Sequence, residues 1–244
     1  MNLECFLAKD LSQTWVDSLQ QIQFDFPVNF IFTDSDSLKS LPTGSLFVDN
    51  EGAKIQALEH QKAVSFSWLK LQAHWRSEAS KVKASPVLKA LGAKPGQWVI
   101  DATCGTGRDS SYFLHHGINV EAYERNKSIF FLLKVSQFLE DFLRERLIIN
   151  YGEASKLAGN SCERVGIYFD PMFDDGQNRK AKPKKQMEVF HSVVGIDQDA
   201  LEQALALRNM SKRLVIKRSP RDGALIEKPS STWQTKSVRF DLYL

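Results

Sequence analysis

Short apolar runs alternate with helical patterns from about residue 90 to the end of this 244-residue chain. The runs have the length and composition of buried strands, and the segments between them carry the wider spacing of amphipathic helices. This alternation is typical of βαβ units, which build a parallel sheet with helices on both faces. It predicts an α/β fold with a doubly wound sheet. The expected strands are residues 98–100, 118–123, 147–149, 167–169, 214–216 and 238–244.

The expected helices of this part cover residues 110–116, about 126–146 and about 198–209, and Asn126 is the expected N-cap of the second. Residues 1–60 have a different pattern, in which 26–33 and 45–48 resemble short strands joined by polar turns. We therefore expect a small N-terminal α/β subdomain at 1–60, a helical linker at 61–90 and the main domain at 91–244.

Composition narrows the functional classes. Hydrophobic residues make up 43% and charged residues 25%, as in ordinary soluble proteins. The N-terminus carries charge too early for a signal peptide, and no apolar run approaches the roughly 18 residues of a membrane span. Cys5, Cys104 and Cys162 form no paired motif, so we expect neither a disulfide framework nor a metal site. These features predict a cytoplasmic protein without membrane contact.

A glycine-containing loop joins the first expected strand to the first expected helix, where ligands meet a helix N-terminus. Asp101 ends the strand, and Gly105 and Gly107 follow it. The dinucleotide-binding motif requires a further glycine or alanine at the position where this chain has Ser110. The pattern favours a sulfonium cofactor, because that ligand has no pyrophosphate and its positive charges suit an acidic strand end.

Two further carboxylates follow strands in the same way. Glu124 ends the second strand, 23 residues after Asp101 (124 minus 101), and is placed to chelate ribose hydroxyls. The alternative is an exposed carboxylate at a strand end. Glu153 and Ala154 follow the third strand and are looser candidates for the adenine end of the cofactor.

The sequence Asp170-Pro171-Met172-Phe173 directly follows the fourth strand. A carboxylate and the Pro171 carbonyl can accept hydrogen bonds from a planar amino group, and an aromatic ring can stack on the base that carries it. The motif therefore indicates chemistry on the exocyclic amine of a nucleobase. Taken alone, the motif is weak evidence, because Asp-Pro after a strand is also a common turn.

Basic residues gather in two places beyond this motif. Five of the seven residues from 179 to 185 are basic, which fits either phosphate contacts or a solvated loop. Lys217 and Arg218 end the fifth strand, where they suit either RNA phosphate or an internal ion pair. The candidate RNA-binding residues are Lys180, Lys182, Lys184, Lys185, Lys217 and Arg218.

In their order along the chain, these elements resemble a class I S-adenosylmethionine-dependent methyltransferase. The last motif is similar to the [Asp/Asn]-Pro-Pro-[Tyr/Phe] motif of amine-directed nucleic-acid methyltransferases, with Met172 in place of the second proline. The match narrows to the RsmJ family over about residues 98–244. It rests on the segments 99–109, 124–126, 170–173, 215–218 and 239–243. Residues 74–81 depart from the glycine-rich, basic stretch typical of that family.

The resemblance implies a Rossmann-like, mostly parallel sheet with an antiparallel terminal strand. It also implies S-adenosyl-L-methionine as cofactor and methylation of the N2 amine of a guanine in 16S ribosomal RNA, naked or in the small ribosomal subunit. Asp170, Pro171 and Phe173 are then the expected catalytic residues. Besides Asp101, Gly105 and Gly107, the implied cofactor contacts are Arg108, Asp109, Glu124, Arg125, Glu153, Ala154 and Asp170.

Two other functions stay open from the sequence. An adenine-N6 methyltransferase acting on DNA or RNA would use nearly the same amine-binding motif. A catalytically silent RNA-binding module would keep the fold without transferring a methyl group.

Overall fold

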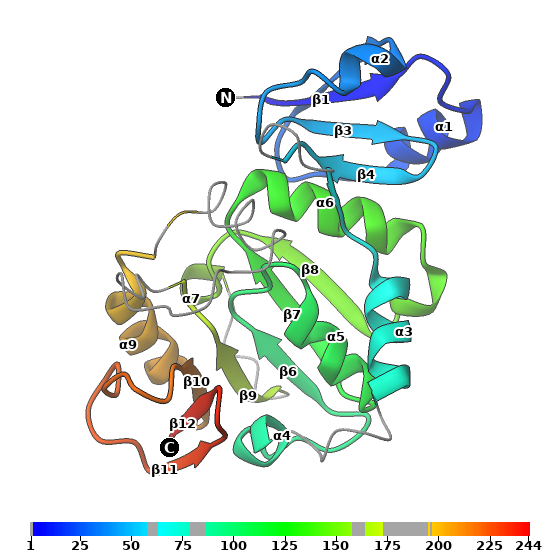
Figure 1. Ribbon diagram of the computed structural model, residues 1–244. Helices are drawn as coiled ribbons and strands as arrows, with labels where there is room; N and C mark the ends of the chain where they lie inside the picture. Colours follow the sequence, from blue (N-terminus) through cyan, green and yellow to red (C-terminus); the bar gives the residue numbers. More distant parts are fainter. Residues whose placement is uncertain (1, 58–62, 79–85, 158–163, 173–194, 196) are drawn as a thin grey trace. The chain divides into compact units, whose positions relative to one another are not determined.

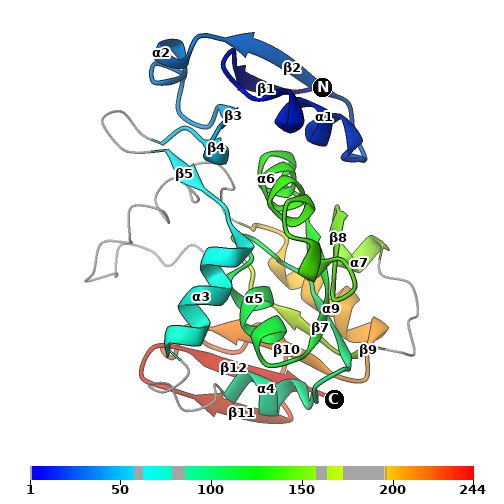
Figure 2. The same ribbon diagram turned by 90° about the vertical axis from the view of Figure 1, so that its right-hand side faces the viewer.

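The computed structural model describes residues 2–57, 63–78, 86–157, 164–172, 195 and 197–244 (Figures 1 and 2). The described residues form two compact units. The first unit contains the described residues up to residue 68, together with residues 126–141 and 195. The second unit contains residues 69–125, 142–172 and 197–244.

The first unit is built on a five-stranded sheet of order β2-β1-β3-β4-β5. Strand β1 runs parallel to β2 and β3, whereas β4 pairs antiparallel with β3 and β5. The expected strands at 26–33 and 45–48 are confirmed as β2 and β3, and β1, β4 and β5 were not predicted. The strands are β1 (Leu3–Ala8), β2 (Val28–Thr33), β3 (Leu46–Asp49), β4 (Gly52–Ile55) and β5 (Val64–Ser65). The helices are α1 (Gln13–Gln21), α2 (Ser35–Leu38) and α6 (Lys127–Phe138).

Helix α6 begins as predicted and ends earlier than predicted. The Asn126 side chain caps it by accepting hydrogen bonds from the amides of Ser128 and Ile129 at 3.0 and 3.2 Å. The helix was expected to continue to about residue 146, but it ends at Phe138, before the short 3-10 helix η1 (Asp141–Leu143). The apolar spacing on which that expectation rested is not matched by burial, because Leu139 and Phe142 remain 46% and 49% exposed.

The second unit is built on a seven-stranded sheet of order β11-β12-β10-β9-β6-β7-β8. Strands β6 to β10 run parallel, and β12 pairs antiparallel with β10. The doubly wound sheet with an antiparallel terminal strand is thus confirmed, whereas β11 was not predicted. The strands are β6 (Trp98–Asp101), β7 (Asn119–Glu124), β8 (Leu147–Tyr151), β9 (Arg164–Phe169), β10 (Leu214–Arg218), β11 (Ser231–Gln234) and β12 (Arg239–Tyr243).

Helices pack against this sheet from both sides. Helices α3 and α5 lie side by side (Figures 1 and 2), and Gln72 Nε2 of α3 donates to the Ser111 carbonyl of α5 at 2.8 Å. Helix α4 packs against β9, β10, β11 and β12, and α9 packs against β10 and α7. The helices are α3 (Trp68–Glu78), α4 (Pro86–Leu91), α5 (Arg108–His115), α7 (Ala154–Leu157) and α9 (Ala200–Met210).

Side chains alternate between the two faces of the central strands, and the polar groups of the site lie on the face opposite one buried apolar cluster. Ile100, Ile167, Phe169 and Ile216 pack in one buried cluster with residues of α9. The residues between or beside them point to the opposite face, toward α5. These are Asp101, Tyr168 and Lys217. The same strands that fill the core therefore also carry the polar groups of the site.

Strands β6 and β9 are neighbours at the centre of the sheet, and the chain proceeds from them in opposite directions. Such a reversal of strand order is where open α/β sheets bind ligands, at the carboxyl ends of the strands. Asp101 ends β6, Glu124 ends β7, and Asp170 follows β9. The topology thus brings three acidic residues to the same edge.

Candidate active site

The loop between β6 and α5 is held by backbone hydrogen bonds to two neighbouring strands. Ala102 N donates to the Tyr168 carbonyl at 2.8 Å and Cys104 N to the Tyr123 carbonyl at 2.9 Å. Gly105 and Gly107 have φ angles of 54° and 74°, which side-chain-bearing residues rarely adopt. Gly107 is the N-cap of α5 and has no side chain to accept a bond from its first turn. The loop therefore presents the start of a helix to a ligand.

Asp101 lies beneath this loop and is 0% exposed. Its Oδ2 accepts a hydrogen bond from Ser110 Oγ at 2.6 Å, and its Oδ1 accepts one from Thr103 N at 3.2 Å. Burial raises the pKa of Asp101 to about 7, although both hydrogen bonds oppose the shift. These contacts favour a supporting role, in which Asp101 shapes the glycine loop, over the direct cofactor contact expected from the sequence.

Glu124 closes the loop from the end of β7. Glu124 is 6% exposed, and its Oε2 accepts a hydrogen bond from Gly105 N at 2.9 Å. Gly105 and Glu124 were both candidate cofactor residues, and this hydrogen bond joins them directly. A buried carboxylate at this strand end is the acceptor that a ribose diol requires.

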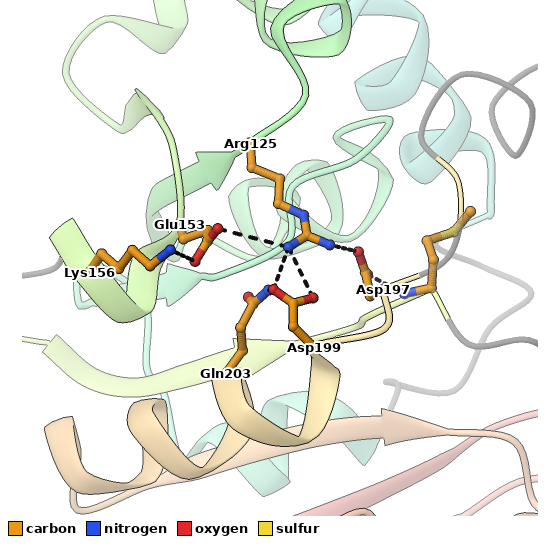
Figure 3. Close-up of polar contacts among 7 residues, drawn as sticks. Arg125, Glu153, Lys156, Asp197, Asp199 and Gln203 are labelled. Carbon is orange, nitrogen blue, oxygen red and sulfur yellow. Dashed lines mark hydrogen bonds and ion pairs between the residues drawn. The ribbon is translucent and has the colours of Figure 1, made fainter.

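Arg125 follows Glu124 and binds carboxylates from another part of the chain (Figure 3). Its Nη1 lies 3.0 and 2.8 Å from Oδ1 and Oδ2 of Asp199, and its Nη2 donates to Oδ1 of Asp197. Glu153 lies farther away, with Oε1 at 3.9 Å from Arg125 Nη1. The guanidinium thus links the end of β7 to the segment before α9.

Glu153 and Ala154 stand at the start of α7, after β8. Glu153 Oε2 pairs with Lys156 Nζ at 2.8 Å, and the Glu153 side chain is 20% exposed. Ala154 is 1% exposed and belongs to the buried core cluster. Any cofactor contact at Ala154 would have to use its backbone, because its methyl group is packed in the core.

The Asp170-Pro171-Met172 segment begins where β9 ends. Asp170 N donates to Thr103 Oγ1 at 2.7 Å, so the segment is tied to the loop after β6. Pro171 is buried. Phe173, expected to stack on the base, lies outside the described residues.

Lys217 joins the two halves of the site. Its Nζ lies 2.7 Å from Oδ2 of Asp109 at the start of α5 and 2.7 Å from Oδ2 of Asp170. Tyr168 OH donates to the same Asp109 oxygen at 2.6 Å. Burial raises the pKa of Asp170, an effect that Lys217 opposes and Asp109 reinforces. Burial also disfavours the charged form of Asp109, but Lys217 and Tyr168 prevail and lower the pKa of Asp109.

This geometry argues against the expected RNA contacts of Lys217 and Arg218. The charge of Lys217 is matched by two carboxylates inside the unit. Arg218 is only 10% exposed at its side chain, and its Nε donates to the Gly223 carbonyl at 3.2 Å. Both cations therefore fit the structural alternative of internal contacts. The other four candidates lie outside the described residues: Lys180, Lys182, Lys184 and Lys185.

Arg108 is exposed at the first position of α5. Its guanidinium lies over the Trp75 ring of α3, 5.5 Å from the ring centroid. Asp109, the next residue, directs its carboxylate to Lys217 and Tyr168. Arg108 and Asp109 thus lie at the glycine loop, as the resemblance implied, while their direct contact with a cofactor stays a prediction.

Four residues that make contacts in the site were not among the site residues predicted from the sequence. Asp197 and Asp199 lie in an acidic run before α9, and Asp199 at the helix N-cap is the signal that was available in the sequence. Thr103 belongs to the site because it lies in the loop between β6 and α5. Tyr168 belongs to it because the alternation of side chains along β9 directs its hydroxyl toward Asp109. The signal for Tyr168 in the sequence was a hydroxyl-bearing side chain within an apolar strand that is directly followed by the Asp170 motif.

Neither a metal cluster nor a membrane helix occurs in the part of the chain that the structure describes. Groups of three or more histidine, cysteine, aspartate or glutamate side chains able to hold a metal ion are absent there. Among these same residues, no helix has both the length and the apolar character needed to span a bilayer.

Comparison with known proteins places the chain in a family. Residues 37–244 match the family model described as "Putative SAM-dependent methyltransferase". Ribosomal RNA small subunit methyltransferase J of Aeromonas hydrophila is 38% identical over 176 residues, which are 66% of this chain and 70% of the relative. The protein of that name from Chromobacterium violaceum is 32% identical over 224 residues, which are 85% and 86% of the two chains.

The fold has a counterpart among solved structures. The crystal structure of a SAM-dependent methyltransferase from Neisseria gonorrhoeae superposes with a TM-score of 0.68 at 21% identity, covering 99% of this chain and 95% of that one. At this identity the likeness concerns the fold, and the family assignment rests on the sequence matches. Together with the glycine loop and the acidic strand ends, those matches show that this chain belongs to the ribosomal RNA small subunit methyltransferase J family of S-adenosylmethionine-dependent methyltransferases.

Proposed function

We propose that this protein methylates the exocyclic N2 amine of one guanine in 16S ribosomal RNA, in the cytoplasm. The names of its relatives support ribosomal RNA of the small subunit as the substrate class. The amine as acceptor is supported by the Asp170-Pro171-Met172-Phe173 sequence. Guanine as the base follows from the family resemblance.

The donor set around the glycine loop fits S-adenosylmethionine. Glu124 would hold the ribose hydroxyls, the start of α5 at Arg108 and Asp109 would meet the methionine end, and Glu153 would lie toward the adenine. Gly105 N already fixes the Glu124 carboxylate at 2.9 Å, which supports a site organised before the ligand arrives. When bound, the cofactor supplies an electrophilic methyl group on a positively charged sulfur.

Asp170 and Pro171 would act on the acceptor. The N2 lone pair of guanine is delocalised into the ring, so the amine is a weak nucleophile. A carboxylate oxygen of Asp170 and the Pro171 carbonyl would accept hydrogen bonds from its two N–H groups, and these bonds strengthen as positive charge develops on the nitrogen. After the methyl group has moved from sulfur to nitrogen, the amine would release one proton. Phe173 would stack on the base at about 1–3 kcal/mol.

This proposal rests on one observation above all: the Asp170-Pro171-Met172 segment is bonded to the loop between β6 and α5. Asp170 is bonded through its amide to Thr103 at 2.7 Å and through its carboxylate to Lys217, which in turn holds Asp109. Positioning the two reactants in one rigid frame is the main contribution a protein can make to a direct transfer.

Substrate recognition would draw on the basic residues Lys180, Lys182, Lys184 and Lys185, which follow the acceptor motif in sequence. Contacts to phosphate would position the RNA, and the reacting base would be read in the site. The base has to leave its stack first, which costs least in single-stranded or loop RNA.

The test is methyl transfer from radiolabelled S-adenosylmethionine to 16S RNA and to small subunits purified from cells that lack this protein. Digestion to nucleosides is expected to give labelled N2-methylguanosine at one position. Labelled N6-methyladenosine would replace the guanine assignment by adenine methylation. RNA binding without any labelled nucleoside would identify a catalytically silent module.

A further inference from the structure

Met172 is the residue at which this chain departs from the two-proline form of the amine-binding motif, and both of its backbone groups are paired with Asp197. Met172 N donates to Asp197 Oδ2 at 2.6 Å, and Asp197 N donates to the Met172 carbonyl at 2.9 Å. A proline at this position has no N–H and cannot make the first bond. The departure from the motif therefore provides a donor, and the structure uses it.

Asp197 is itself fixed. Its side chain is only 9% exposed, and its second carboxylate oxygen accepts from Arg125 Nη2. The same guanidinium holds both oxygens of Asp199, whose Oδ2 also accepts from Gln203 Nε2 at 2.7 Å on α9 (Figure 3). A guanidinium that bonds two carboxylates through two of its nitrogens fixes their geometry more tightly than a lysine would, because its donors lie in one plane at fixed spacing.

Arg125 directly follows Glu124, the proposed ribose-binding residue. A continuous path of charge-assisted hydrogen bonds thus runs from the end of β7 through Arg125 and Asp197 to the backbone of Met172. Because Asp170 is fixed at its own amide and Met172 at both of its backbone groups, the Pro171 carbonyl between them is restrained from both sides.

We propose that Asp197 is a positioning residue for methyl transfer, which orients the Asp170-Pro171 pair by clamping Met172 and is itself oriented by Arg125. This inference rests on the proposed function, since it assigns Asp197 to the amine-binding segment of that reaction. It predicts that loss of Asp197 slows the transfer step and leaves cofactor binding largely intact.

The first experiment measures single-turnover methyl transfer, S-adenosylhomocysteine affinity and melting temperature for Asp197→Ala, with Glu202→Gln as control. Glu202 is an exposed acid on the first turn of α9. We expect Asp197→Ala to lower the transfer rate about 10- to 100-fold, with a change in affinity below about threefold and Glu202→Gln at the wild-type rate. Wild-type transfer by a folded Asp197→Ala would overturn the proposal.

Met172→Pro separates positioning from general destabilisation, because it deletes the N–H that Asp197 holds. If the two residues act through one bond, Asp197→Ala in the Met172→Pro background will cost less than about threefold beyond the Met172→Pro variant. If the double variant instead loses rate by the product of the two single-variant losses, the result would contradict the clamp. Should either variant fail to fold, Asp197→Asn and Arg125→Lys provide weaker perturbations, and full activity of both would count against it.

Amide hydrogen exchange makes the clamp testable even if the substrate proves not to be ribosomal RNA. The Met172 amide is expected to be protected in the wild type and in Glu202→Gln, and to exchange at least about tenfold faster in Asp197→Ala. Unchanged protection of Met172 would refute the clamp itself. Faster exchange in Asp197→Ala, together with no methylated guanosine from the wild type, would refute only the proposed function.

Discussion

The ammonium of Lys217 lies 2.7 Å from Oδ2 of Asp170, on the face of the sheet that packs against α5. It lies equally close to Asp109, so one positive charge is shared by two carboxylates. Burial alone would favour protonated carboxyl groups, and Lys217 opposes this at both residues. The lysine therefore maintains the charge with which Asp170 would bind the amine.

Replacing Lys217 by Gln should shift the pH profile of the reaction. Without the ammonium, the pKa of Asp170 rises further, so the acid limb of kcat moves to higher pH and activity is lost at a pH where the wild type is still active. The free energy of unfolding should fall by roughly 1–3 kcal/mol. A pH series of single-turnover rates tests this, with exposed Lys212→Gln as control. An acid limb that stays in place would show that Lys217 does not set the ionisation of Asp170.

Asp170→Ala should abolish methyl transfer, because both the charge and the acceptor oxygen are removed. We expect a loss of at least about 100-fold in rate. RNA affinity, measured by filter binding, should remain within about threefold of the wild type, because phosphate contacts dominate it. Asp170→Asn keeps one acceptor oxygen and should retain measurable activity. A folded Asp170→Ala variant that still methylates RNA would remove Asp170 from the mechanism.

The sequence predicted the frame of this site better than its internal contacts. Strand ends locate Asp101, Glu124 and Asp170, because parallel strands align their carboxyl ends at one edge. Its place at a strand end left Lys217 between RNA phosphate and an internal ion pair, and its partner could not be identified, since Asp109 is 108 residues away in sequence. The same holds for Arg125 and Asp197, which are brought together by tertiary structure across 72 residues.

Local sequence patterns predicted the start of α6, but they predicted neither its end nor strand β11. Asn126 was identified as a cap because an N-cap interaction involves only neighbouring residues. The end of α6 was missed because Leu139 and Phe142 continue the helical spacing without being buried. Short, largely exposed β11 carries little apolar patterning, and it forms by pairing with β12.

Glu124→Gln should weaken cofactor binding. Glutamine can still accept the hydrogen bond from Gly105 N, but the charged acceptor for the ribose hydroxyls is lost. The affinity for S-adenosylhomocysteine should fall about 10- to 100-fold, which corresponds to roughly 1.5–3 kcal/mol. Calorimetry measures this directly, with exposed Glu145→Gln as control. In a thermal shift assay the wild type should be stabilised by S-adenosylhomocysteine and not by NAD, and unchanged affinity of Glu124→Gln would contradict the assignment.

Asp101→Asn should make the protein less sensitive to alkaline pH. The pKa of Asp101 is about 7 in the folded state against 3.8 for the ordinary group, so the folded protein binds one more proton between these values. The wild type therefore loses up to about 4 kcal/mol as pH rises through this window. Asparagine carries no such penalty and keeps an acceptor for Thr103 N. Urea unfolding of Asp101→Asn at pH 5 and 8 should show its advantage growing with pH, and Glu227→Gln, an exposed acid, should show none.

Lys184 and Lys185 should contribute to RNA affinity through charge alone. Replacing both by Gln removes two candidate phosphate-binding groups, so binding should weaken similarly for all RNA sequences. The slope of log affinity against log salt should shrink by about 0.7 for each phosphate that is no longer neutralised on single-stranded RNA. Exposed Lys212 and Lys236, replaced together by Gln, control for the loss of two positive charges. Equal salt slopes in the two double variants would indicate a general electrostatic effect and would remove Lys184 and Lys185 from the RNA-binding surface.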